Sequence, residues 1–127
     1  MSELQGLLDV VRSGDFLILD TETTGLERGE VVQIRIIDAS GKTIIDTLVK
    51  PREPIPPSTT RIHGITNQMV AKAPPFADIV ENLRQTINGK HIIVYNAVYD
   101  RKMLHQSAEA AGIKKTDWKA ISNWWCA

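Results

Sequence analysis

The chain has very little cysteine, carries no net charge and contains no long apolar run. Cys126 is its single cysteine among 127 residues, which excludes an internal disulfide and favours a reducing, cytoplasmic setting. Basic and acidic residues number 15 each, which argues against a protein that coats nucleic acid by bulk electrostatics. No segment is long and apolar enough to span a membrane, and residues 1–3 lack the basic start of a signal peptide. We therefore expect no membrane partner.

What is present is the pattern of one mixed α/β domain. Leucines at helical spacing predict a short helix or arm over residues 1–14, and the domain is expected over 15–127. The turn at 38–42 makes the second and third strands antiparallel, while helical crossovers in the second half imply parallel pairing there. The predicted strands are 16–20, 31–37, 43–49, 91–95 and 118–122, and the predicted helices are 76–87 and the segment capped by Asn96 that runs to Ala111.

Two acids stand at the end of the first predicted strand. Asp20 and Glu22 follow the apolar run 16–19 and, two residues apart, share one face of a strand. Two carboxylates there repel each other, and each is costly to remove from water. A hard divalent cation with oxygen ligands would compensate both charges. Taken alone, the pair could equally be a solvated couple at a strand–loop boundary.

A third acid, Asp100, falls in the first turn of the helix that follows strand 91–95. Its spacing places it on the face shared with Met103, Leu104 and Ala108, which is the buried face. The helix dipole alone could explain an acid in a first turn. If strands 16–20 and 91–95 are neighbours, however, all three acids converge at the carboxyl edge of the sheet. Three carboxylates there would suit two Mg²⁺ or Mn²⁺ ions, as used in phosphodiester hydrolysis.

The motifs resemble those of a known family. Asp20-Thr21-Glu22-Thr23-Thr24-Gly25 resembles the first exonuclease motif of the DEDD superfamily, and segment 96–100 (Asn-Ala-Val-Tyr-Asp) resembles its second. His63-Gly64-Ile65-Thr66 is similar to a stretch of the DnaQ-like (DEDDh) branch. The resemblance implies a ribonuclease H-like fold and removal of nucleotides from single-stranded 3′ ends. It implies metal ligation and catalysis by Asp20, Glu22 and Asp100, and substrate binding by Thr23, Thr24, Gly25, Leu26, His63 and Asn96.

The third motif of that branch, His-x-x-x-x-Asp, does not occur in this sequence. The positions five residues after His63, His91 and His105 are Gln68, Asn96 and Ala110. We expect the general base and a fourth carboxylate to lie outside these residues, in a C-terminal part that is missing here, so that activity of the 15–127 region alone is impaired. Without this motif, His63-Gly64-Ile65-Thr66 is what favours the DEDDh branch over the tyrosine-bearing one.

The alternative hypothesis is a non-catalytic module that keeps the fold and binds nucleic acid or a protein. A polymerase or another subunit is a further expected partner. Trp124 and Trp125 look like the start of a helix with large apolar side chains, which makes self-association possible through them.

Overall fold

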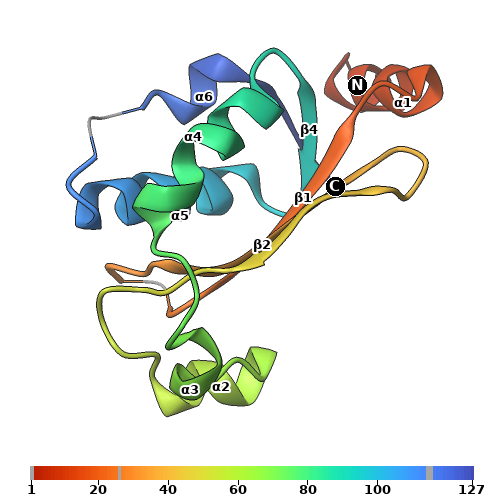
Figure 1. Cartoon of the computed structure of the whole chain (residues 1–127). Helices are drawn as coiled ribbons and strands as arrows, with labels where there is room; N and C mark the ends of the chain where they lie inside the picture. Colours follow the sequence, from red (N-terminus) through yellow and green to blue (C-terminus); the bar gives the residue numbers. More distant parts are fainter. Residues whose placement is uncertain (1, 26, 114–115) are drawn as a thin grey trace.

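The computed structural model describes residues 2–25, 27–113 and 116–127, and its centre is a five-stranded sheet (Figure 1). The strand order is β3-β2-β1-β4-β5. β1 pairs antiparallel with β2, and β2 with β3, whereas β1–β4 and β4–β5 are parallel. The predicted mixed sheet is therefore confirmed. The bounds are β1 Leu17–Thr23, β2 Val31–Asp38, β3 Thr43–Leu48, β4 His91–Val94 and β5 Asn123–Cys126.

The helices are distributed unevenly around this sheet. α4 (Phe76–Ile87), α5 (Ala97–Ala110) and α6 (Trp118–Ile121) lie on one side, whereas α1 (Ser2–Ser13) and the α2–α3 pair (Pro57–His63, Asn67–Val70) lie near opposite ends (Figure 1). In the described residues, no helix has both the length and the apolarity needed to cross a bilayer.

Side chains of α4, α5 and the sheet form the main core, and a smaller cluster lies under α2 and α3. Both follow from apolar residues at helical spacing facing buried strand positions. Fully buried members of the main core include Ile34, Ile36, Leu83, Ile87, Ile92, Met103 and Leu104, and the smaller cluster comprises Val32, Ile55, Ile65 and Val70.

The start of α5 is determined by its cap. Asn96 has extended backbone, and its side-chain oxygen accepts a hydrogen bond from the Tyr99 N–H at 3.2 Å, as the sequence predicted. β4 ends at Val94, so only a short connection separates the strand from the helix. This connection places the first turn of α5 beside the end of β1.

Two predictions about the C-terminal segment are wrong. Residues 118–121 form α6 rather than a strand, because Asp117 caps that turn through the Ala120 N–H. Residues 123–126 form strand β5 rather than the start of a helix, and Trp124 and Trp125 pair with Ile92 and Ile93 of β4. Bulky aromatic residues suit such a half-buried strand.

Both indoles of this strand have partners within the chain. The Trp124 N–H donates to the Trp118 carbonyl at 2.7 Å, and the Trp125 N–H donates to His91 Nδ1 at 3.0 Å. The Trp125 ring also lies against Gly6 of α1. Because both rings are already half-buried, self-association through them has less apolar surface available than the sequence suggested.

Candidate active site

β1 carries the first two acids, and it extends three residues further than predicted. Leu19 and Thr23 are buried, whereas Asp20 is exposed and Glu22 is partly exposed. Strand alternation thus puts the two acids on one face, as predicted, and the threonines on the other. β1 pairs with β4 only through Leu17 and Ile18, so the rest of its edge is open to the first turn of α5.

Asp100 projects from α5 toward this open edge. Its residue is only 7% exposed, and its carboxylate accepts a hydrogen bond from the Thr21 hydroxyl at 2.9 Å. Burial raises the pKa of Asp100, and the nearby charge of Asp20 raises it further, while hydrogen bonds from Thr21 and from the Asn96 backbone act in the opposite direction. Because the pKa is raised overall, the negative charge of this buried carboxylate is not fully compensated.

Glu22 belongs to the same electrostatic neighbourhood. Its pKa is raised by burial and by the charge of Asp20, and it is lowered to a smaller extent by His63. Asp20 is therefore close enough to affect both Glu22 and Asp100. One acid of β1 thus affects the pKa of a second acid on the same strand and of a third on α5.

The three acids are not held in the geometry of a completed metal site. Across residues 2–25, 27–113 and 116–127, no group of three His, Cys, Asp or Glu side chains is arranged to hold a metal ion. The donor set itself, carboxylate oxygens with uncompensated charge, fits a hard divalent ion such as Mg²⁺ or Mn²⁺.

The predicted Thr-Thr-Gly pocket is a tightly bonded turn. The Thr24 N–H donates to the Glu30 carbonyl at 2.9 Å, and the Glu30 N–H donates to the Thr24 hydroxyl at 3.0 Å. The Gly25 N–H is directed at the Thr23 hydroxyl, at 3.3 Å. Both threonines are buried, so their hydroxyls hold the turn together. Leu26, also predicted to bind substrate, lies outside the described residues.

A glycine closes this turn. A side chain at Gly29 would place its Cβ 1.9 Å from the Gly25 carbonyl oxygen and 2.9 Å from Met103 Sδ. Only glycine allows such a close approach of one backbone segment to another. The shape of the turn beside Glu22 therefore depends on Gly29.

His63 connects the α2 segment to the end of β1. Its Nδ1 accepts a hydrogen bond from the Ile65 N–H at 3.0 Å, so the proton of the neutral ring is on Nε2 and is donated to the Thr23 carbonyl at 3.0 Å. Both ring nitrogens are thus engaged in hydrogen bonds within the chain, and the contact of His63 with substrate stays a prediction. Asn96 has the helix-capping role described above, and its contact with substrate stays a prediction.

Three further residues were not identified from the sequence. The Tyr99 hydroxyl forms a 2.8 Å hydrogen bond with the Thr23 hydroxyl, which ties α5 to β1. Glu30 is buried and accepts hydrogen bonds from the Arg52 and Glu53 N–H groups. Ile62, next to His63, is 83% exposed. An apolar residue in a short polar segment before Gly64 was the available signal for Ile62.

Comparisons with known proteins agree with this geometry. The family model described as Exonuclease matches residues 17–124. An uncharacterized exonuclease, CP81, of Escherichia phage 186 is 42% identical over 101 residues, which cover 79% of this chain and 52% of the relative. DNA polymerase III subunit epsilon of Treponema pallidum is 35% identical over 105 residues, covering 79% and 48%. The structure of exonuclease X in complex with 5′ overhanging duplex DNA aligns with a TM-score of 0.63 and 30% identity, covering 87% of this chain and 58% of that one.

The fold and the matched motifs define a nuclease of the ribonuclease H-like class. The chain belongs to the exonuclease family, and the resemblance to DnaQ-like exonucleases is confirmed. It spans about half the length of the two curated relatives described above (52% and 48%).

Proposed function

We propose that residues 15–127 are an exonuclease domain that hydrolyses the terminal phosphodiester at nucleic-acid 3′ ends, in the 3′-to-5′ direction. The observation that carries the proposal is the buried Asp100 carboxylate, bonded to Thr21 and electrostatically linked to Asp20. A scaffold with no chemistry to perform has little reason to bury an acid beside two others. Membership of the exonuclease family supports the same conclusion.

Asp20, Glu22 and Asp100 would hold two Mg²⁺ or Mn²⁺ ions. When bound, such ions activate the attacking water and stabilise the leaving oxygen. The residues of the chain provide the frame for that chemistry. Thr21 orients the Asp100 carboxylate, and Tyr99 holds α5 at a set distance from β1. The exposed Ile62 adjoins His63, whose ring is bonded to Thr23, so we expect Ile62 and the turn at Thr23–Gly25 to border a bound terminal nucleotide.

No described residue is placed as the general base. His63 uses both ring nitrogens in hydrogen bonds, and no His-x-x-x-x-Asp motif occurs in the sequence. We therefore expect this chain alone to have weak activity and reduced metal affinity. The engagement of both His63 nitrogens also favours the second candidate function, a non-catalytic module that binds nucleic acid or protein.

A nuclease assay on single-stranded DNA and RNA, labelled at the 5′ end, distinguishes the two candidates. With Mn²⁺ we expect products that shorten from the 3′ end. Cleavage should be faster in a version extended at its C-terminus by a segment with the third motif, and it should be lost in Asp100→Asn. Asp15→Asn is the matched control, because Asp15 is exposed and precedes the start of β1, whereas the acids lie further along β1 and on α5. An extended version that also fails with Mn²⁺ would exclude the exonuclease.

Calorimetry with Mn²⁺ tests the metal site independently of turnover. We expect this chain to bind Mn²⁺ and Asp20→Ala to bind it much more weakly. Absence of binding in both proteins would favour the non-catalytic module.

The partners follow from the same proposal. We propose a single-stranded 3′ end as substrate, a polymerase or other protein subunit as a possible assembly partner, and a cytoplasmic location. One relative is named as a polymerase III subunit, and one structural neighbour holds duplex DNA with a 5′ overhang, which leaves a recessed 3′ end.

A further inference from the structure

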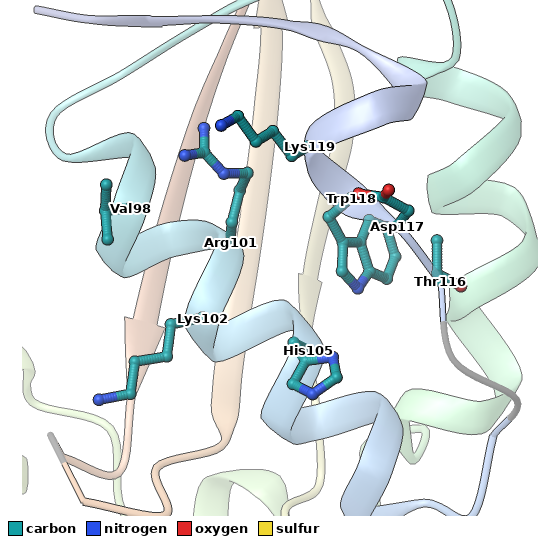
Figure 2. Close-up of a pocket in the computed structure, with 8 residues that line it drawn as sticks. All are labelled: Val98, Arg101, Lys102, His105, Thr116, Asp117, Trp118 and Lys119. Carbon is teal, nitrogen blue, oxygen red and sulfur yellow. The ribbon is translucent and has the colours of Figure 1, made fainter.

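A pocket of about 630 Å³ lies between α5 and α6 (Figure 2). Cationic side chains dominate its lining. It is formed by Val98, Arg101, Lys102, His105, Thr116, Asp117, Trp118 and Lys119. The site proposed above uses none of them.

The permanent cations of this pocket outnumber its acids. Arg101, Lys102 and Lys119 line it with one acid, Asp117, whose carboxylate caps α6 through the Ala120 N–H. Within the described residues, no salt bridge includes any of these three cations. His105 has its own partner, Glu109, at 3.3 Å. Cations gathered in a concave site without matching acids attract an anion.

Two of the cations are positioned to act together. Arg101 on α5 and Lys119 on α6 reach toward the same end of the pocket (Figure 2). The Arg101 guanidinium lies 5.6 Å from the centre of the Trp124 ring, a cation–π contact that restricts its motion. The floor is the indole of Trp118, which is 3% exposed, and its N–H has no acceptor in the part of the chain that the structure describes.

The pocket is close to the acids along the chain. Asp100 and Arg101 are adjacent in α5, one directed at β1 and the other at the pocket. Val98, in the first turn of the same helix, lines the pocket and is 68% exposed. A nucleic-acid strand whose 3′ end lies at Asp100 can therefore continue around the start of α5 to reach Arg101.

We propose that the α5–α6 pocket binds backbone phosphates of the substrate strand, upstream of its 3′ end, through Arg101 and Lys119. The inference rests on the proposed function. A planar guanidinium held on an aromatic ring and a flexible ammonium form a suitable pair for phosphate oxygens. Because the net charge of the chain is zero, attraction of a polyanion has to come from a local group of cations such as this one.

The test is binding of a fluorescein-labelled single-stranded oligonucleotide in EDTA, followed by anisotropy over a series of KCl concentrations. Each lost phosphate contact reduces the slope of log affinity against log salt by about 0.7 for single strands, so Arg101→Gln/Lys119→Gln should flatten it by about 1.4. The matched control is Arg12→Gln/Lys42→Gln, which removes the same charge from exposed positions on α1 and the β2–β3 turn. Arg101→Lys/Lys119→Arg keeps both charges and should keep the wild-type slope.

Thermal unfolding establishes that each variant is folded. Equal slopes for the pocket variant and its control would overturn the proposal, and so would absence of oligonucleotide binding by the wild type. Pocket-dependent binding of poly-glutamate without binding of the oligonucleotide would also overturn it, since the ligand would then be an acidic protein. Cleavage with Mn²⁺ tests the carboxylates separately from the pocket. Failure of the pocket proposal changes only the binding result in EDTA, whereas failure of the proposed exonuclease activity changes only the cleavage result.

Discussion

Replacing Asp100 by asparagine should stabilise the metal-free protein at neutral pH while it weakens metal binding. The side chain is 7% exposed, and its pKa is raised by burial and by Asp20. A carboxyl whose pKa is higher in the folded than in the unfolded state binds more protons when folded. Its contribution to stability is present below the unfolded value, about 3.9, and is lost as pH rises through the folded one. Asparagine does not titrate and avoids that loss.

The magnitude follows from the contacts of this carboxylate. The Thr21 hydroxyl can still donate to an asparagine oxygen, but a hydrogen bond to a neutral acceptor is worth roughly 1 kcal/mol less than one to a charge. Burial and repulsion by Asp20 raise the pKa of Asp100 more than the hydrogen bonds lower it. Asp100→Asn should therefore increase the free energy of unfolding. Removing an unfavourable charge of this kind commonly adds about 0.5–2 kcal/mol to the free energy of unfolding. A gain of about 1 kcal/mol raises the Tm of a domain of this size by roughly 4 °C.

Differential scanning calorimetry at pH 4 and pH 7, with EDTA or with Mn²⁺, measures this effect. In EDTA the Tm of Asp100→Asn should exceed that of the wild type at pH 7, and the gap should shrink toward pH 4. Mn²⁺ at 100 times its Kd should stabilise the wild type by about 2.7 kcal/mol and the variant by less. Asp15→Asn should show neither behaviour. A variant less stable than the wild type in EDTA at pH 7 would refute the argument that the charge of Asp100 is uncompensated.

Three further substitutions test the frame of the site. Thr21→Val removes the hydroxyl that donates to the buried carboxylate and should cost about 1–3 kcal/mol in urea unfolding, with weaker Mn²⁺ binding; an unchanged midpoint would contradict the role of that bond. Gly29→Ala forces a Cβ onto the Gly25 carbonyl and should cost roughly 1–3 kcal/mol, more than alanine at Gly6, where the flexible Trp125 ring can move. Ile62→Ser should leave the free energy of unfolding within about 0.5 kcal/mol, because the side chain is exposed, but should raise the KM for oligonucleotide in the extended enzyme; an unchanged KM would remove Ile62 from the substrate site.

The strongest sequence predictions concerned features that are local in the chain. The stripe of α4 and the Asn96 cap of α5 were predicted correctly, since both depend on spacing within a few residues. The common face of Asp20 and Glu22 follows from strand alternation alone. The approach of Asp100 to them required only that β1 and β4 be neighbours, which the parallel pairing confirms.

The sequence did not show structure that depends on distant partners. Residues 123–126 have no strong local preference that excludes a helix, and they form a strand because the edge of β4 is open to pair with them. The bonds of His63 to Thr23, and of Tyr99 to Thr23, join residues 40 and 76 positions apart. No periodicity or motif encodes such contacts.

The sequence by itself determined the class of fold, the first four strands and the choice of three acids as candidates, because apolar periodicity and motif spacing are properties of short segments. Only the tertiary structure decided how those acids are placed. It buried Asp100 against Thr21, occupied both nitrogens of His63, and gathered Arg101 and Lys119 from two helices into one pocket. Burial, hydrogen bonding and local charge arise from packing between elements that are distant in the chain, and these are the quantities that set the chemistry of a side chain.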